Sequence, residues 1–542
     1  MEHLLDRLLG VTGAPTVWLL GIALAMIASC LMAAGKPATL EELDEMRNKL
    51  AHRQRPLILN NDGNEPVYYC TKVDRDEFLS KRTSPLAGSQ VSSIFYCTWS
   101  SGFGFFTHNT QIGEVFNTKE KPFDKNLTQE LLDAGLDPLQ MVIDWCRDND
   151  TEVFWSMRMN DVHDGSYPPM VPQWKHEHPE LLMGALNNRP KGAGDGRAWA
   201  GVDYAREEVR DRAFRFIQEV CRNYDVDGIE LDFFRHLYYF KSRAWGNEVS
   251  QLERDKMSAL ISRIHRMTQT EGLRRGRPIL LGIRVPDSVD YCRSVGLDVE
   301  RWLAEGWVDL MAVTGYFKLR PWEDSVALGH SYAVPVYCCL SESRLKAAAG
   351  KIRNAPQTYR ARATNVWNAG ADGVYTFNAF DPDSAMWREL GDPGTVKSKD
   401  KHYFANVRGL WGANAYSKGG EQYRTIPDFS PERPIKLQPG ERAQVSFPVG
   451  QKLAASAADG GDPVCALRLQ FSKLGQAGDV QVQLNAKGLQ SPEADGDWLE
   501  FPVEPTCVKL GANEIVVTLG ADAAAGPVWT DSVLTVAYGS VE

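Results

Sequence analysis

Short apolar runs recur along this chain from about residue 55. Each is followed by a polar loop and then by a stretch whose apolar positions are spaced as on one face of a helix. β-branched and aromatic residues dominate the runs, which predicts strands. Several runs are apolar almost throughout, as parallel strands covered on both faces must be. Eight strands are predicted in this way, at residues 56–61, 91–99, 152–160, 227–234, 278–285, 307–316, 333–340 and 372–380.

Amphipathic stretches between these runs predict helices, at residues 131–149, 207–223, 251–269, 298–305 and 359–368. Eight strands alternating with helices predict an α/β fold of the (β/α)8 TIM-barrel type over residues 55–389. The alternative is an open, doubly wound sheet, which would carry a glycine-rich phosphate-binding turn after its first strand. Residues 60–64 read NNDGN and lack that pattern.

The pattern changes on both sides of the predicted barrel. Residues 37–54 are a polar connector or a short helix, and residues 390–432 are a linker punctuated by glycine and proline. Residues 433–542 contain short alternating runs separated by Gly, Asp and Pro, which predict an accessory β-sandwich of jelly-roll type.

The N-terminal segment 1–36 predicts export. Residues 17–35 form an uncharged apolar run that is long enough for a signal peptide or a membrane anchor. Within this run, Ile27-Ala28-Ser29-Cys30 resembles a lipoprotein signal, in which Cys30 would carry the lipid. We therefore expect a periplasmic or extracellular protein that contacts a membrane only through this segment or through a lipid on Cys30.

The net charge and the cysteine positions bear on nucleic-acid binding, disulfide bonds and zinc sites. The net charge of -10 gives no support to nucleic-acid binding, which favours a basic face. The spacing of the ten cysteines predicts neither a disulfide framework nor a zinc site. Cys97, Cys338 and Cys339 lie in apolar runs and are expected to pack as small hydrophobic residues. Cys465 and Cys507 are the single pair for which we expect a disulfide.

Enzymes built on such barrels carry their chemistry at the carboxyl ends of the strands. There this sequence places carboxylates, arginines, amides and a tryptophan, which suit a polyhydroxylated substrate. We expect carbohydrate as the partner and neither a cofactor nor a metal. The predicted substrate-binding residues are Asn61, Asp62, Trp99, Arg158, Asn160, Asp161, His163, Arg235, His236, Arg284, Tyr316 and Asn378.

The fourth strand carries the most informative carboxylates. Glu230 and Asp232 are two residues apart and therefore share one face of the strand. Two carboxylates on an inward face perturb each other's pKa, which is how one acid stays protonated at working pH. Asp232 is the predicted catalytic residue. In the alternative interpretation Glu230 forms an internal ion pair with Arg158 or Arg284 and has no catalytic role.

The same strand resembles known families. Asp227-Gly-Ile-Glu230-Leu-Asp232 is similar to the fourth-strand signature of glycoside hydrolase family 18, although Phe234 stands where that family has its general-acid glutamate. Residues 154–161 (FWSMRMND) and 227–235 (DGIELDFFR) more closely resemble the glycosyl-hydrolase-like family 10 barrels. This resemblance implies an exported barrel that acts on polysaccharide.

Hydrolysis of a glycosidic bond needs a second carboxyl group as proton donor. Glu342, after the seventh strand, is the first choice, followed by Asp287 after the fifth strand and by Glu230. The sequence thus favours an exported glycoside hydrolase that acts on a poly- or oligosaccharide.

Two other functions remain open. His176, Glu177 and His178, together with His163, would suit a metal-dependent hydrolase or deacetylase. Phe234, in place of an acid, is also compatible with a carbohydrate-binding barrel that has lost catalysis.

Overall fold

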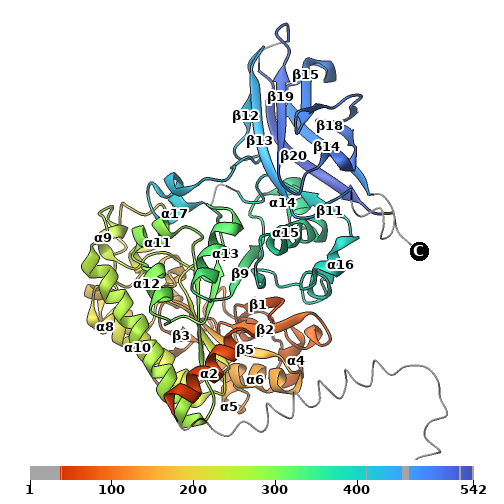
Figure 1. The fold of residues 1–542 in the computed structure, drawn as a ribbon. Helices are drawn as coiled ribbons and strands as arrows, with labels where there is room; N and C mark the ends of the chain where they lie inside the picture. The colour runs from red at the N-terminus through yellow and green to blue at the C-terminus, as the bar shows by residue number, and fades with distance from the viewer. Residues whose placement is uncertain (1–36, 38, 410–411, 455–462, 524–525, 540–542) are drawn as a thin grey trace, which may run out of the picture.

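A closed barrel of parallel strands and a β-sandwich make up the molecule (Figure 1). The structure is a computed structural model, and it describes residues 37, 39–409, 412–454, 463–523 and 526–539. The predicted export segment and Cys30 therefore lie outside the described residues. Within the described part of the chain, no helix combines the length and the apolar character that a membrane crossing requires.

The barrel confirms the predicted TIM fold and excludes the open sheet, because the eight strands close on themselves in the order β1-β10-β9-β8-β7-β6-β5-β2. Seven of the predicted runs contain one strand each, and the eighth, 333–340, ends one residue before its strand does. The strands are β1 (Leu57–Asn61), β2 (Val91–Tyr96), β5 (Glu152–Arg158), β6 (Gly228–Asp232), β7 (Leu280–Val285), β8 (Leu310–Val313), β9 (Val336–Ser341) and β10 (Gly373–Phe377). Two further strands, β3 (Phe105–Phe106) and β4 (Glu114–Val115), pair with each other in the loop after β2.

Burial explains why these runs form strands. Every residue of β5, β6 and β7 is buried, as both-sided coverage requires. Close packing between neighbours also requires Gly228 at the start of β6, because a Cβ there would lie 2.2 Å from the ring of Phe154 on β5. The register places Ser156, Glu230 and Gly282 side by side across β5, β6 and β7.

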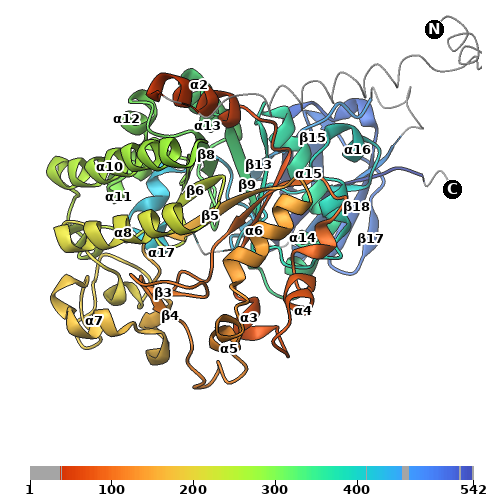
Figure 2. The same ribbon diagram turned by 90° about the horizontal axis from the view of Figure 1, so that it is seen from below.

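Helices surround the strands (Figure 2). The larger ones are α2 (Leu40–Ala51), α6 (Pro138–Asp148), α8 (Glu207–Asn223), α10 (Gln251–Arg275), α13 (Trp322–Ser331) and α15 (Pro356–Asn368). The shorter helices are α3 (Glu65–Tyr68), α4 (Arg75–Ser80), α5 (Thr128–Asp133), α7 (Gln173–Glu177), α9 (Lys241–Ala244), α11 (Val289–Val295), α12 (Val299–Ala304), α14 (Ala347–Arg353), α16 (Pro393–Lys397) and α17 (Ala413–Tyr416).

Helix boundaries follow local signals. The predicted helix 131–149 is two helices, α5 and α6, because Gly135 adopts a positive φ of 75° and Pro138 starts a new helix. The helix predicted at 251–269 continues to Arg275, where Gly276 ends it in the left-handed conformation. The segment 37–54 contains α2, which begins with a capping box formed by Thr39 and Glu42.

The sandwich consists of two antiparallel sheets. The first contains β11 (Lys401–Tyr403), β20 (Val528–Ala537), β14 (Val464–Ser472), β18 (Trp498–Val503) and β17 (Glu493–Asp495), with β12 (Ile435–Lys436) also paired to β20. The second contains β13 (Arg442–Val449), β19 (Gly511–Leu519), β15 (Val480–Leu484) and β16 (Lys487–Gly488). Burial alternates along β14 and β15, which matches the alternating sequence pattern.

The expected disulfide is wrong. Cys465 on β14 and Cys507 after β18 are both free thiols, and Cys507 lies 3.2 Å from the ammonium of Lys487. Cys97, Cys338 and Cys339 are buried, as predicted.

The predicted linker is part of both domains. Its strand β11 pairs with β20 of the sandwich. The chain then passes along the barrel, in the described residues 404–409 and 412–434 with α17, and returns to β20 through β12. Arg353 of α14 and Asp531 of β20 form a buried ion pair of two hydrogen bonds, at 2.6 and 2.8 Å, across the junction. Figure 1 shows α17 at the upper edge of the barrel, the edge nearer the sandwich, with α2 toward the opposite end of the barrel.

Candidate active site

Unusual backbone conformations gather where the barrel strands end. Thr98, Trp99 and Ser100 after β2 have φ angles of 47°, 67° and 36°, Thr314 after β8 has 67°, and Asn378 after β10 has 53°. Side chains other than glycine rarely adopt positive φ, and such conformations cluster at functional sites. The carboxyl end of the barrel is therefore the place to look for chemistry, as the sequence predicted.

Asp232, the predicted catalytic carboxylate, ends β6 inside the barrel. Arg284 of β7 donates one hydrogen bond to each Asp232 carboxylate oxygen, at 3.0 and 2.6 Å. The backbone N–H of Phe234 donates a third, at 2.9 Å. Both partners are almost fully buried, Asp232 at 2% and Arg284 at 0% exposure. Arg284 therefore pairs with Asp232 and not with Glu230, the partner expected in the alternative interpretation of the sequence.

Glu230 lies one inward position deeper on β6 and is fully buried. Its carboxyl group accepts hydrogen bonds from Ser156 of β5 and from the hydroxyl of Tyr375 of β10, the latter at 2.8 Å. Burial, followed by repulsion from Asp232, raises the pKa of Glu230 to about 7. The two carboxyl groups of β6 therefore have different environments: Asp232 is held by an arginine, and Glu230 by two hydroxyl groups and, at 3.5 Å, by the amide of Asn60.

A second ion-pair cluster lies at the ends of β1 and β5. Arg158 donates to Asp62 at 2.6 Å and to Asp161 at 3.3 Å, and its guanidinium lies 5.9 Å from the ring of Trp99. Burial alone would raise the pKa of Asp62, but Arg158 and Arg235 outweigh it and lower this pKa to about 2. The structure thus brings together four of the predicted substrate-binding residues that carry charge.

His163, His236 and Asp161 are close enough to offer three metal-ligand atoms within 4.8 Å of one another. His163 Nδ1 contacts Asp161 at 2.8 Å, and the N–H of Val162 donates to His236 Nδ1 at 3.3 Å. Burial lowers the pKa of both histidines. Arg158 and Arg235 lie against this cluster, and two guanidinium groups disfavour a further cation.

The metal site considered from the sequence does not form. His176 lies exposed on α7, and His178 follows it and contacts Glu180 at 3.4 Å. Among the described residues, the metal-capable cluster contains His163 but neither His176 nor His178.

Glu342 lies at the rim of the barrel end. Its side chain is 42% exposed, and its carboxylate accepts a hydrogen bond from Asn378 at 3.4 Å. Arg344 lies 3.9 Å from the same carboxylate and 4.3 Å from the centre of the Tyr316 ring. Glu342 is therefore far more accessible than the carboxyl groups of β6.

Two aromatic rings, Phe377 and Tyr316, lie between the buried Asp232–Arg284 pair and the charged residues Glu342 and Arg344 at the rim. The guanidinium of Arg284 lies 3.9 Å from the centre of the Phe377 ring, and Phe377 packs edge-on against Tyr316 at 5.3 Å. Arg235 lies over both rings, at 5.7 and 5.5 Å. Burial and the nearby Arg158 lower the pKa of Arg235 to about 10. Tyr316, Phe377 and Arg235 thus separate the Asp232–Arg284 pair from the rim.

The former linker covers this end of the barrel. Tyr416 of α17 packs on Tyr316 and Phe317 after β8, with ring centres 6.3 and 6.1 Å apart. Tyr291 of α11 donates to the carbonyl of Ala413 at 3.1 Å. This cover explains why most of the predicted site residues are buried rather than open to solvent.

Two of the predicted substrate-binding residues, Asn160 and Asn61, use their side-chain amides to hold barrel-end loops in place. Asn160 is fully buried and bonds the backbone of Val202 through both ends of its amide, at 2.9 and 3.0 Å. Asn61 donates to Glu65 at 2.6 Å and accepts from Arg82 at 3.2 Å. The structure gives both amides a clear role in positioning the barrel-end loops.

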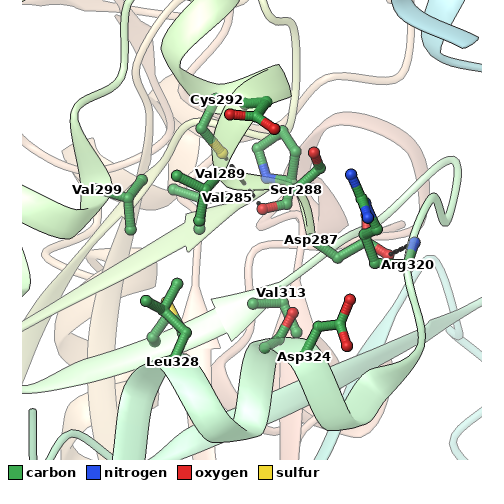
Figure 3. A pocket seen from close by; sticks show the side chains of 14 residues that line it. Val285, Asp287, Ser288, Val289, Cys292, Val299, Val313, Arg320, Asp324 and Leu328 are labelled. Carbon is green, nitrogen blue, oxygen red and sulfur yellow. Dashed lines mark hydrogen bonds between the residues drawn. The ribbon is translucent and has the colours of Figure 1, made fainter. Parts of the chain in front are cut away.

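Asp287, the second choice for proton donor, lies apart from this cluster. It lines a cavity of about 160 Å³ between β7, β8 and helices α11 to α13 (Figure 3). Its carboxylate accepts backbone N–H bonds from Leu319, at 2.9 Å, and from Arg320, at 3.0 Å. Burial raises its pKa. Asp287 therefore fixes the loop between β8 and α13.

Some site residues were not predicted from the sequence. Ser156 and Tyr375 hold Glu230, and the strand register that places Ser156 beside Glu230 could have indicated the first of them. Phe377 at the end of β10 could have been found in the same way. Tyr416 gave no sequence signal, because it reaches the barrel from the segment predicted as a linker.

No protein-family model and no curated protein matches this sequence. Among solved structures, the chain is similar to a cycloisomaltooligosaccharide glucanotransferase from Paenibacillus sp. (10% identity, TM-score 0.35), over 89% of this chain and 57% of that chain. It is also similar to a GH36 α-galactosidase from Geobacillus stearothermophilus (11% identity, TM-score 0.37), over 89% and 59%. A glycoside hydrolase family 18 N-acetylglucosaminidase from Paenibacillus barengoltzii (12% identity, TM-score 0.34) is covered over 99% of its length by 63% of this chain.

The chain spans less than two thirds of the first two enzymes. All three neighbours act on carbohydrate, but identities and TM-scores this low carry no argument about activity. The function of this chain therefore rests on its own site residues.

Proposed function

We propose that this protein hydrolyses a glycosidic bond in a poly- or oligosaccharide at the carboxyl end of its barrel. The observation that carries the proposal is the contrast between the two carboxyl groups of β6. Arg284 binds Asp232 as an ion pair, whereas Glu230 beside it has a pKa of about 7. A titratable group that burial and a neighbouring charge perturb in this way, beside a buried ion pair at the end of a barrel strand, is typical of an active site.

Asp232 is the proposed nucleophile or base, and Glu342 is the proposed proton donor to the leaving oxygen. Glu342 suits that role because it is the exposed carboxylate at the end of β9 and is oriented by Asn378. Arg158, Arg235 and Tyr316 are the proposed contacts to sugar hydroxyls and ring faces. The likeness of residues 154–161 and 227–235 to the glycosyl-hydrolase-like family 10 supports the same reaction.

The test is turnover on a panel of plant, algal and host-type polysaccharides, with product analysis. In this proposal Glu342→Gln reduces kcat by about 10²- to 10⁴-fold, the usual contribution of general acid–base catalysis. Asp232→Asn reduces it at least as much per folded molecule.

Asp309→Asn is the matched control. Asp309 forms a similarly buried, doubly bonded pair with Arg47, at 2.7 and 2.6 Å, at the opposite end of the barrel. It should change stability and leave the activity of the folded enzyme intact. Full activity of Glu342→Gln on a substrate that the wild type cleaves would contradict its role as donor.

A second candidate is a carbohydrate-binding barrel without catalysis. It is favoured by the burial of Asp232 and Glu230 beneath Tyr316 and Tyr416. In that case the protein would be retarded in gels that contain a polysaccharide, yet release no product from it. Retention without turnover across the panel would replace the hydrolase proposal with this one.

We also propose export, on the basis of residues 17–35 alone. If Cys30 carries a lipid, the wild type should partition into detergent and Cys30→Ser should not. A mature N-terminus beyond residue 33, measured by mass spectrometry, would exclude the lipid.

A further inference from the structure

A second cavity lies at the junction of the two domains, and it is larger than the one beside Asp287. Its volume is about 560 Å³, within the range of small-molecule sites. The wall is formed by the loop between β8 and α13, by β9 and α15, and by sandwich strands β13 and β19 with the segments 404–408 and 425–427. Figure 1 shows α13, α15 and β13 on the sides of the barrel and sandwich that face each other.

Three basic side chains line this cavity without carboxylate partners. Lys318 contacts the face of Trp322 at 4.1 Å, and Arg362 donates to the carbonyl of Ser341 at 2.8 Å. Arg408 donates to the hydroxyl of Ser341 and to the carbonyl of Glu342. In the part of the chain that the structure describes, none of the three basic groups forms an ion pair, although Glu323 and Asp324 also line the cavity.

Burying the positive charges of Lys318, Arg362 and Arg408 without a counter-charge is energetically unfavourable. Burial lowers the pKa of Lys318 and of Arg362, and burial together with repulsion from Arg362 lowers the pKa of Arg408 to about 9. Buried charges are costly unless they are paired. An anion in the cavity would therefore offset the cost of burying these three charges.

The polar groups of the same wall suit a ligand that also carries hydroxyl groups. The side-chain oxygen of Asn365 on α15 is buried and has no hydrogen-bond partner among the described residues. Asn368, one turn further along α15, lines the cavity too. An unpaired amide acceptor favours a donor such as a sugar hydroxyl, which the sulfate ion lacks.

We propose that this cavity binds an acidic sugar, a saccharide residue that bears a carboxylate or a sulfate. Lys318, Arg362 and Arg408 bind its acidic group, and Asn365 accepts a hydrogen bond from one of its hydroxyls. The site is separate from the barrel end and holds whether or not the barrel end is catalytic.

The experiment is isothermal titration of the purified protein at low ionic strength with sodium glucuronate, with glucose and with sodium sulfate. Glucuronate differs from glucose in the carboxylate alone, so it should bind clearly and glucose should not. Lys318→Gln should weaken glucuronate binding about tenfold or more, because charge-assisted bonds to an anion are the strong ones. Added salt should weaken it as well.

Two control variants locate the binding. Lys351→Gln removes the same charge from an exposed position on α14 outside the cavity and should leave the affinity unchanged. Arg235→Gln alters the barrel end and should also leave it unchanged. If Lys318→Gln does not fold by circular dichroism, Arg362→Gln takes its place.

Several results would overturn the proposal. They are the absence of glucuronate binding, equal affinity for glucose, equal affinity for sulfate, and equal losses in Lys318→Gln and Lys351→Gln. Loss of binding in Arg235→Gln alone would move the acidic sugar to the barrel end.

Discussion

Asp232→Asn should destabilise the protein strongly, whatever its effect on activity. Asp232 and Arg284 are 2% and 0% exposed, and two hydrogen bonds join them. Asparagine keeps the shape but leaves the guanidinium buried without a counter-charge, next to the ring of Phe377 at 3.9 Å. Breaking a buried pair by removing one partner costs about 3–5 kcal/mol, and we expect a loss of that size.

The assay is urea denaturation followed by near-UV circular dichroism, which reports the buried aromatic residues of the barrel. Asp211→Asn is the matched control, because the Asp211–Arg263 pair is 48% and 44% exposed. It should cost less than about 1 kcal/mol. A second change, Arg284→Met, should recover part of the loss in the Asp232→Asn background, since it removes the unpaired charge. A loss below about 1 kcal/mol for Asp232→Asn would refute this reasoning.

Further predictions concern other parts of the chain. Glu230 has its pKa raised from 4.5 to about 7. It therefore contributes stability that is fully present below pH 4.5 and is lost as the pH rises through about 7. The melting temperature of Glu230→Gln should therefore change less between pH 4.5 and about 7 than that of the wild type. An unchanged pH dependence in the variant would contradict the raised pKa of Glu230. Asn160→Ala should cost about 2–4 kcal/mol in chemical denaturation, because it leaves buried backbone groups unpaired; a loss near zero would mean that the loop does not need the amide. Thiol titration in denaturant without reductant should find all nine cysteines from Cys70 to Cys507 free, in addition to Cys30 where it is unmodified, and a count lower by two would restore the disulfide. A chain that ends at Pro431 should aggregate or melt earlier than the full chain, because it leaves Arg353 without Asp531.

The barrel could be predicted because burial on both faces leaves a strong sequence signal. Parallel strands such as β7 and β8 are apolar almost throughout, and their spacing left room for the helices between them. The place of the site followed from the same reasoning, since strand ends meet at one end of a barrel. The side chains of Glu230 and Asp232 do share a face of β6, as their spacing required.

The partners of these residues could not be predicted, because they depend on register and on distant segments. Arg284 stands opposite Asp232 rather than Glu230 only through the pairing of β6 with β7. Asp287 looked catalytic from its place after β7, but the loop after β8 folds onto it. Asn160 follows β5 directly, and its amide binds the backbone of a loop about forty residues away, whose path leaves no pattern in the sequence.

The described residues 404–409 and 412–434 leave the sandwich and return to it, so they belong to the sandwich and are not a linker before it. The chain enters the sandwich at β11, leaves to lay Tyr416 over the barrel end, and returns at β12, and both strands pair with β20. A recombination event that exchanged the accessory domain would therefore also exchange the segment with Tyr416 that covers the carboxyl end of the barrel. In this architecture, access to the barrel would be inherited together with the sandwich, while the strand-end charges beneath would be inherited with the barrel.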